Sequence, residues 1–330
     1  MRAAASRVRV EVFVDAGDTQ RMLEHDVRSG LAGTPKHLPP KWFYDARGSA
    51  LFDEITRLAE YYPTRCEREI LVREAPSIAR ASAEGGVRTL VELGSGTSEK
   101  TRILLDALSA ACGLRRFVPF DVSEETLRAA SHDVADAFPS LRVHAVAGDF
   151  ERHLDRLPIA GRTLVAFLGG TIGNLVPAPR ADLLQSLAKI LSPGDLLLLG
   201  TDLVKDPDRL VAAYDDPTGV TAAFNRNVLH VVNRALGSDF APDRFAHRAL
   251  WDAEEEWMEM SLVATEEMDV HVPVMGDPVH FAAGESMRTE ISAKFRRSGI
   301  EDELAASGFA MVSWMTDSRE DFAVSLARRA

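Results

Sequence analysis

Two glycines that follow a run of apolar residues mark the part of this chain where chemistry is easiest to place. The sequence Val91-Glu92-Leu93-Gly94-Ser95-Gly96 is followed by Thr97-Ser98-Glu99-Lys100. It predicts a buried strand, a glycine turn and a helix that begins at Thr97 or Ser98. A turn of this kind lets a nucleotide cofactor lie close to the backbone at the helix N-terminus. Glu99 stands where a dinucleotide fingerprint needs its third glycine, so a dinucleotide is disfavoured.

Acidic residues after the next two predicted strands narrow the choice of cofactor. The acid-x-Gly-x-Gly pattern of the first run resembles the first motif of methyltransferases that use S-adenosyl-L-methionine (SAM). Asp121 could accept hydrogen bonds from ribose hydroxyls, and Asp149 could accept one from the adenine amino group. Phe150 could cover the adenine ring, and Lys100 could reach a carboxylate. Each acid taken alone is more often a helix N-cap, but their order at successive strand ends favours SAM, with S-adenosyl-L-homocysteine (SAH) as the product.

Candidates for an acceptor site lie elsewhere in the chain. Asn174 follows another predicted strand, and its amide offers both a carbonyl and an NH₂ group. Gly169-Gly170-Thr171 just before it would leave room for an amine that carries methyl groups. Glu290 and Ser292 alternate along a predicted strand and so share one face, as the residues of a solvent-facing polar edge also would. Met260 could add an apolar wall or belong to the core.

The elements that must position these residues alternate from about residue 87 to 203. Strands are predicted at residues 89–93, 116–120, 142–147, 163–168 and 195–200, and helices at 98–111, 124–138 and 178–191. This alternation is typical of a parallel sheet that binds ligands at the carboxyl ends of its strands. Residues 309–315 and 322–327 predict a closing antiparallel hairpin. We therefore expect an α/β fold, with the Rossmann-like sheet of a class I SAM methyltransferase.

Two segments do not continue the alternation. Residues 1–66 look helical and loop-like, while residues 204–294 begin with a helical stretch from 207 to 234 and finish with strand-like alternation. We expect a SAM-binding domain made of residues 67–203 and 295–330. A second, α+β substrate-binding domain would be made of residues 13–66 and 204–294.

Composition limits the partners. The 330 residues include 50 acidic and 38 basic side chains, a formal net charge of −12, which disfavours nucleic acid. The 2 cysteines and 9 histidines lack the spacing of metal ligands or of a disulfide framework, so we expect no metal. No apolar run approaches the roughly 18 residues of a membrane span, and no secretory signal is apparent. We expect a monomeric cytoplasmic protein that acts on a small molecule, away from membranes.

Several stretches together resemble the L-histidine Nα-methyltransferases of ergothioneine biosynthesis. They are Pro40-Lys41-Trp42-Phe43-Tyr44-Asp45, Glu60-Tyr61-Tyr62-Pro63-Thr64-Arg65 and residues 91–100, 167–174, 200–205, 214–216, 224–227 and 289–295. The match runs over most of the chain. It implies SAM-dependent trimethylation of the histidine α-amine, which gives hercynine.

The same resemblance implies roles for single residues. Tyr61, Asn174 and Tyr214 would hold the backbone groups of the amino acid, and Glu290 and Ser292 would bind its imidazole. Tyr44 would lie near the amine, and Tyr44 and Asn174 are the catalytic candidates. The residues implied to contact SAM are Gly94, Gly96, Lys100, Asp121, Asp149 and Phe150. Two other functions stay open: the same scaffold could methylate another amino acid or an aromatic amine, or the chain could bind SAM without catalysis.

Overall fold

The computed structural model describes residues 7–14, 16–96, 98 and 100–330 of the chain. These residues form two compact units, each built from separate stretches of sequence. Unit 1 takes its residues from Met1–Asp15, Arg65–Leu203 and Phe295–Ala330, and unit 2 from Ala16–Thr64 and Val204–Lys294. None of the helices formed by the described residues combines the length and the apolar character that a bilayer crossing requires.

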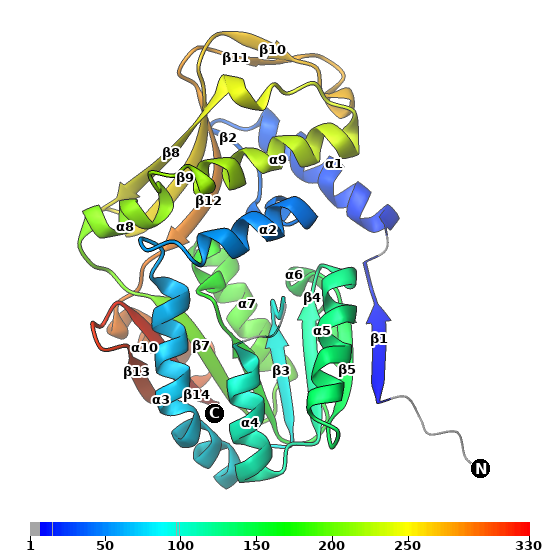
Figure 1. Ribbon diagram of the computed structural model, residues 1–330, viewed down its shortest axis with the longest axis vertical. Coiled ribbons are helices and arrows are strands. Elements are labelled where there is room, and N and C mark those ends of the chain that lie inside the picture. Colours follow the sequence, from blue (N-terminus) through cyan, green and yellow to red (C-terminus); the bar gives the residue numbers. More distant parts are fainter. Residues whose placement is uncertain (1–6, 15, 97, 99) are drawn as a thin grey trace. The chain divides into compact units, whose positions relative to one another are not determined.

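Unit 1 is built on an eight-stranded sheet with the order β1-β5-β4-β3-β6-β7-β14-β13 (Figure 1). Its strands are β1 (Val8–Val12), β3 (Thr89–Leu93), β4 (Arg116–Asp121), β5 (Arg142–Ala147), β6 (Thr163–Phe167), β7 (Leu196–Asp202), β13 (Phe309–Thr316) and β14 (Phe322–Arg329). The pairs from β1 to β7 are parallel, whereas β14 is antiparallel to both β7 and β13. The predicted α/β fold class, its parallel strands and its closing hairpin are confirmed.

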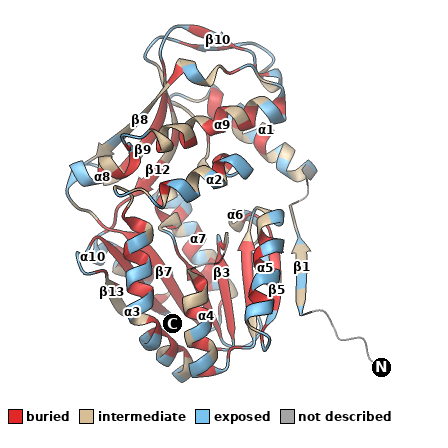
Figure 2. Cartoon of the chain, in the orientation of Figure 1, coloured by how far each residue is buried: buried red, intermediate tan, exposed pale blue. Residues whose placement is uncertain are grey.

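The order of the strands reverses at β3. The chain runs outward from β3 through β4 to β5 and then returns to the other side of β3 with β6 and β7. In open sheets, ligands bind beyond the carboxyl ends of the strands at such a reversal. Figure 2 shows β3 and β7 buried along their length, as expected for strands covered on both faces.

Helices connect the strands of unit 1. They are α3 (Pro63–Glu84), α4 (Thr101–Cys112), α5 (Glu124–Ala137), α6 (Phe150–His153), α7 (Pro177–Ile190) and α10 (Arg297–Ala306). The predicted start of α4 was wrong by three to four residues, because the helix begins only at Thr101. Gly96 and Ser98 have φ angles of 47° and 56°, a left-handed conformation that an α-helix does not tolerate. Thr97 lies outside the described residues.

The edge strand β1 corrects the expectation that residues 1–66 contain only helices and loops. Val8, Val10 and Val12 alternate with charged residues, and the segment pairs in parallel with β5, Val8 opposite Val143 and Val12 opposite Ala147. An alternation of period two is the signature of a half-buried strand. The N-terminal segment therefore belongs to the sheet of unit 1.

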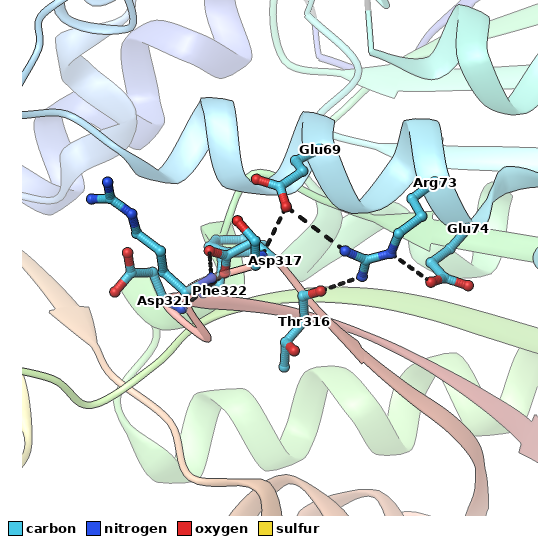
Figure 3. Close-up of polar contacts among 9 residues, drawn as sticks. Glu69, Arg73, Glu74, Thr316, Asp317, Asp321 and Phe322 are labelled. Atoms are coloured by element: carbon cyan, nitrogen blue, oxygen red, sulfur yellow. Dashed lines mark hydrogen bonds and ion pairs between the residues drawn. The ribbon is translucent and has the colours of Figure 1, made fainter.

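The turn between β13 and β14 is fixed by one carboxylate (Figure 3). Asp317 Oδ1 accepts the backbone N–H groups of Asp321 and Phe322 at 2.8 and 2.7 Å. Glu69 on α3 accepts the N–H of Ser318 at 2.8 Å. These bonds tie the hairpin turn to the first half of α3.

Unit 2 contains a four-stranded sheet in the order β2-β12-β9-β8 and a two-stranded sheet of β10 and β11. The strands are β2 (Lys36–His37), β8 (Phe245–Asp252), β9 (Trp257–Ala264), β10 (Met268–Val270), β11 (Val279–Phe281) and β12 (Ser286–Ala293). Its α-helices are α1 (Ala16–Ala32), α2 (Ala46–Ile55), α8 (Pro207–Tyr214) and α9 (Val220–Leu236). The helical stretch expected from residue 207 to 234 is thus interrupted, because Asp216 accepts the N–H groups of Val220 and Thr221 and starts a new helix.

Candidate functional site

The glycine turn after β3 leaves open space where a ligand can approach the backbone. Gly94 and Gly96 have φ angles of 66° and 47°, and a Cβ atom built on either would meet nothing within 4 Å. The N–H of Gly94 donates to the carbonyl of Phe120 at 2.8 Å, which ties the turn to the end of β4. The turn therefore combines fixed backbone with an empty approach, as a cofactor site requires.

A buried acid lies under this turn. Glu92 accepts hydrogen bonds from the Thr101 hydroxyl and, at 3.3 Å, from the Ser98 hydroxyl. Burial raises the pKa of Glu92 to about 8, although these hydrogen bonds and the charge of Lys100 oppose the shift. Glu92 therefore connects the last turn of β3 to the first turn of α4 largely as a neutral acid near pH 7.

Asp121 and Asp149 both stand where the sequence placed them, at the carboxyl ends of β4 and β5. Asp121 accepts the N–H groups of Gly96 and Ser123 at 2.9 and 3.0 Å, and burial raises its pKa. Asp149 is the N-cap of α6 and accepts the N–H of Glu151 at 2.8 Å. A carboxylate has about four acceptor positions, so these backbone bonds leave Asp121 able to accept from a ligand.

Phe150 and Lys100 complete the predicted cofactor group in unit 1. The Phe150 ring meets Phe167 edge-on, with centroids 5.6 Å apart, so one ring braces the other. Lys100 is the N-cap residue of α4. It lies one position before the helix, whereas the predicted helix had placed it in the first turn. Its ammonium donates to Glu67, a residue that the sequence reasoning did not identify.

Glu67 is a fully buried carboxylate on α3 that joins two loops of unit 1. Its Oε1 accepts the N–H of Gly169 at 2.6 Å, and its Oε2 accepts from Lys100. A Cβ atom on Gly200 would come within 2.3 Å of Glu67 Oε1, so the bare backbone of β7 makes room for the carboxylate. The sequence around Glu67 contains many acidic and basic residues, so nothing in it distinguishes Glu67 from its exposed neighbours on the helix.

The loop after β6 takes its shape from its glycines. Gly169 and Gly170 have φ angles of 80° and 69°, in the left-handed region that favours glycine. A Cβ on Gly170 would lie an ordinary 3.6 Å from the Phe322 ring. The backbone conformation therefore explains this glycine pair without the room for methyl groups that the sequence suggested. Asn174, half-buried, ends the 3₁₀ turn Thr171–Asn174 that follows.

Three polar side chains meet at the end of β12 in unit 2. Tyr214, at the end of α8, donates its hydroxyl proton to Ser292 Oγ at 2.7 Å. Lys294 Nζ donates to Ser292 Oγ at 2.7 Å and to the Tyr214 hydroxyl at 2.9 Å. All three residues are buried. Lys294 was missed, although it continues the alternation of Glu290 and Ser292 by one further step.

Glu290 lies on the same face of β12 as Ser292. It stands opposite Met260 of β9 in the antiparallel ladder, and Ser292 stands opposite Met258. Burial raises the pKa of Glu290 to about 7, and the charge of Lys294 acts against that shift. The structure thus combines a carboxylate, a hydroxyl and an apolar wall at one edge of the unit 2 sheet.

Buried hydrogen bonds hold Tyr214 in place. His247 of β8 contacts the Tyr214 carbonyl through Nε2 and the Asn225 amide through Nδ1, both at 2.8 Å. Because the Asn225 NH₂ donates to Nδ1, the proton of the neutral ring is on Nε2 and points at the carbonyl. Burial lowers the pKa of His247, which keeps the ring neutral. The motif residue Asn225 therefore supports the site indirectly.

Aromatic rings connect Tyr44 and Tyr61 with Tyr214. Phe52 of α2 lies 5.7 Å from the Tyr44 ring and 6.2 Å from the Tyr61 ring, and Tyr61 lies 6.4 Å from Tyr214. The Tyr44 side chain belongs to a residue that is 39% exposed. The Asn227 amide of α9 donates to the Phe43 carbonyl and to Asp45, which fixes the backbone on both sides of Tyr44.

One further group of ligand-type atoms lies in unit 1. Cys66, Asp317 and Asp321 bring such atoms within 4.8 Å of one another. Burial, reinforced by the two carboxylates, raises the pKa of the Cys66 thiol to about 12, so it is a protonated thiol near pH 7. Both oxygens of Asp317 already accept backbone N–H groups of the hairpin turn. The predicted absence of a metal stays a prediction.

The comparison with known proteins decides the family. A family model described as "Histidine-specific methyltransferase, SAM-dependent" matches residues 23–329. The chain belongs to this family. The family resemblance inferred from the sequence motifs is confirmed, as is the prediction of a SAM-dependent methyltransferase.

Relatives of this methyltransferase match it over nearly its whole length. The histidine N-alpha-methyltransferase of Mycolicibacterium smegmatis is 57% identical over 318 residues, which are 96% of this chain and 98% of the relative. The protein of that name from Mycobacterium tuberculosis is 55% identical, over 93% of this chain and 95% of the relative. Ergothioneine biosynthesis protein 1 of Neurospora crassa is 33% identical over 62% of this chain, but over only 23% of its own length. A solved SAM-dependent methyltransferase from Clostridium acetobutylicum aligns with a TM-score of 0.46 at 12% identity, over 85% of this chain and 98% of its own.

The residues of this methyltransferase fit SAM at the end of β3. The open space at Gly94 and Gly96 lets a ligand come close to the backbone. Lys100 offers a positive charge at the start of α4, where a carboxylate is also favoured by the helix N-terminus. Asp121 and Asp149 offer carboxylate acceptors at the two neighbouring strand ends.

Proposed function

We propose that this methyltransferase transfers three methyl groups from SAM to the α-amino nitrogen of L-histidine and so produces hercynine, the first step of ergothioneine biosynthesis. The observation that carries the substrate is the group at the end of β12, where a carboxylate and a buried hydroxyl share one strand face. A carboxylate accepts a hydrogen bond and a hydroxyl can donate one, and the two nitrogens of a neutral imidazole need one of each. The names of the mycobacterial relatives support the same substrate.

SAM supplies an electrophilic methyl group on a positively charged sulfur. In each transfer the lone pair of the amine attacks the methyl carbon in line with the sulfur, the carbon–sulfur bond breaks, and its electrons return to the sulfur, which leaves SAH. The amine must therefore be unprotonated, and the neighbouring sulfonium charge lowers its pKa. The work left to the protein is to hold the two reactants in line.

The residues proposed for the donor are those of the glycine turn and the strand ends. Gly94, Gly96 and Lys100 would hold the methionine part, Asp121 the ribose, and Asp149 with Phe150 the adenine. Lys100 is held by Glu67, so its ammonium is oriented before SAM arrives. Such preorganisation spares the side-chain ordering that binding otherwise costs.

The residues proposed for the acceptor are those that the family resemblance implies. Tyr61, Asn174 and Tyr214 would hold the amino and carboxylate groups, Gly169 and Met260 would line the pocket, and Glu290 and Ser292 would bind the imidazole. Tyr44 and Asn174 would act at the nitrogen, where Tyr44 positions the neutral amine or helps its proton leave to solvent. Aromatic rings such as Tyr44 and Tyr61 also attract the quaternary ammonium that the third transfer creates. The monomeric state and the cytoplasmic location stay predictions.

Binding measurements on two variants test these roles. Glu290→Ala and Ser292→Ala should each weaken L-histidine binding at least about tenfold, because a ring nitrogen loses its partner in a buried site. Calorimetry should find SAH affinity unchanged within about twofold. Glu254→Ala, at an exposed residue of the same unit, is the matched control. Unchanged histidine affinity in both variants would contradict the proposed imidazole site.

A further inference from the structure

The hydrogen bonds at Ser292 determine what that side chain can offer a ligand. A serine hydroxyl accepts two hydrogen bonds and donates one. Ser292 Oγ receives one from Lys294 Nζ and one from the Tyr214 hydroxyl. No group among the described residues accepts the proton of Ser292 itself. With both acceptor positions filled, Ser292 has only a donor left.

The direction of the bond between the two hydroxyls follows from their chemistry. A phenol is a stronger acid than an aliphatic alcohol, so it is the better donor and its oxygen is the weaker acceptor. Lys294 is an ammonium with three donors and no acceptor, and it also donates to the Tyr214 oxygen at 2.9 Å. That bond further favours Tyr214 as donor, because hydrogen bonds in such a chain polarise one another.

Glu290 is the opposite kind of partner two residues away. Glu290 and Ser292 share one face of β12, and Lys294, just after the strand, continues their alternation. Burial raises the pKa of Glu290 to about 7, and the charge of Lys294 opposes this. A ligand N–H that donates to the carboxylate would favour its ionised form further.

We propose that Lys294 is a specificity-determining residue, because it makes Ser292 an obligatory hydrogen-bond donor. The site then accepts only the neutral imidazole, whose N–H group donates to Glu290 and whose unprotonated nitrogen accepts from Ser292. This inference rests on the proposed function, which places the imidazole at these two side chains. Lys294 need not touch the substrate, because it acts through the hydroxyl of Ser292.

The protonated ring is rejected for two reasons. An imidazolium carries two N–H donors, so one of them would face the Ser292 proton, and a buried donor without an acceptor is costly. Its positive charge would also lie near the buried ammonium of Lys294. The described residues at this end of the strand also include Tyr214 and Asp215 of the α8 terminus, Tyr61 and the neutral His247 of β8. Glu256 accepts the backbone N–H of Lys294 through its carbonyl, and β9 contributes the uncharged Met258 and Met260.

The pH dependence of binding tests the inference. Histidine is compared with 3-(1,2,4-triazol-3-yl)alanine, whose ring has the same shape but is too weak a base to be protonated at pH 5.5. Calorimetry at pH 7.5 and 5.5 gives, at each pH, the ratio of the affinity for histidine to the affinity for the triazole analogue. Protonation of Glu290 and of the amino and carboxylate groups of the ligand affects both affinities alike, so it cancels in this ratio. In the wild-type protein the ratio should fall about tenfold at pH 5.5, since an imidazole with a pKa near 6.5 is then mostly protonated.

Lys294→Met should flatten this dependence, so that the ratio changes less than about threefold, because Ser292 regains an acceptor position and a positive charge is removed. Lys36→Met is the matched control: Lys36 is another largely buried lysine of unit 2, ion-paired with Glu285, and its variant should keep the tenfold fall. SAH binding by each variant shows that it is folded. A constant ratio in the wild type, or a tenfold fall in Lys294→Met, would overturn the inference. A failure of histidine to bind at either pH while SAH binds would instead overturn the proposed function.

Discussion

Glu67 shows how much of a site can depend on a residue that never meets the ligand. Its carboxylate accepts from the Gly169 backbone and from the Lys100 side chain, and it is fully buried. A buried carboxylate needs such partners, since an unpaired charge in the interior is strongly unfavourable. Glu67 therefore sets the position of the cation proposed for SAM and of the loop proposed for the acceptor.

Glu67→Gln should weaken SAH binding and lower stability together. The amide keeps an acceptor for Gly169 but leaves the Lys100 ammonium without its counter-charge. We expect a loss of about 2 kcal/mol in the free energy of unfolding, less than for a fully buried pair because the Lys100 side chain is 28% exposed. SAH affinity should fall about tenfold by calorimetry. Glu84→Gln, at an exposed position of the same helix, should change neither the SAH affinity nor the free energy of unfolding. If Glu67→Gln behaved like Glu84→Gln in both measurements, Glu67 would not position Lys100.

Glu92 makes the stability of the protein depend on pH. Its pKa is about 8 in the folded state against a model value of 4.5, so between these pH values the folded state binds more protons than the unfolded state. The free energy of unfolding therefore falls as pH rises, by about 1.4 kcal/mol per pH unit from this group. Glu92→Gln lacks this slope. In urea titrations, the free energy of unfolding of this variant minus that of the wild type should therefore rise by about 3 kcal/mol from pH 5.5 to pH 7.5. If this difference in the free energy of unfolding were the same at both pH values, Glu92 would not be a buried acid with a raised pKa.

Which residues could be predicted from the sequence depended on whether their partners are local. Asp121 and Asp149 follow predicted strands, so topology alone brings them to one edge of the sheet. Glu67 has partners that are distant in sequence, and no periodicity relates them. Lys294 lay within reach, because it continues the alternation of Glu290 and Ser292.

At the scale of elements, the close approach of α3 to β7 limits what the strand can carry. A Cβ on Gly200 would lie 2.3 Å from Glu67 Oε1 and 3.3 Å from the Phe322 ring. The helix is also tied to the β13–β14 turn, where Glu69 accepts the N–H of Ser318. Neither the helix nor the strand can therefore move away freely to accommodate a side chain.

Gly200→Ala should reproduce the effect of losing Glu67. The methyl group would displace the carboxylate from Gly169, and overpacking of this kind costs about 1–3 kcal/mol. Gly299→Ala is the control: a Cβ there meets nothing within 4 Å, and alanine in α10 should be neutral or slightly stabilising. Thermal unfolding and SAH calorimetry on both variants test this. Equal behaviour of the two alanine variants would show that the approach to Glu67 is not limiting.

The elements themselves were largely predictable, and their ends were less so. The buried parallel strands read as continuous apolar runs, which is why β3 and β5 were predicted with their observed bounds. The start of α4 was misplaced because Gly96 and Ser98 adopt left-handed conformations that serve the turn. The strand β1 was missed because its partner, β5, is more than a hundred residues away.

For the whole molecule, ligand binding should be linked to unfolding. A ligand that binds only the folded state stabilises it by about 2.7 kcal/mol when its concentration is a hundred times Kd. SAH should therefore raise the unfolding temperature of the full chain. In Asp121→Asn the rise at the same SAH concentration should shrink, because the ribose loses a charged acceptor. Asp106→Asn, at an exposed position of α4, should keep the full rise; equal rises in the two variants would remove Asp121 from the cofactor site.

The charge of the whole molecule agrees with a small-molecule acceptor. A net charge of −12 repels phosphate backbones.

The two units interleave in sequence, since each is assembled from separated segments. Composition and the βα alternation identified the sheet of unit 1. The sheet of unit 2 depends on pairing β2 with β12, a contact between distant segments that sequence patterns do not encode.

The most direct test of the account is to identify the product. The protein is incubated with SAM and an equimolar mixture of amino acids that includes histidine, tryptophan and tyrosine, and the products are analysed by tandem mass spectrometry. We predict histidine with one, two and finally three added methyl groups, all on the α-nitrogen. Methyl transfer to tryptophan or tyrosine in place of histidine, or to a ring nitrogen of histidine, would contradict the account.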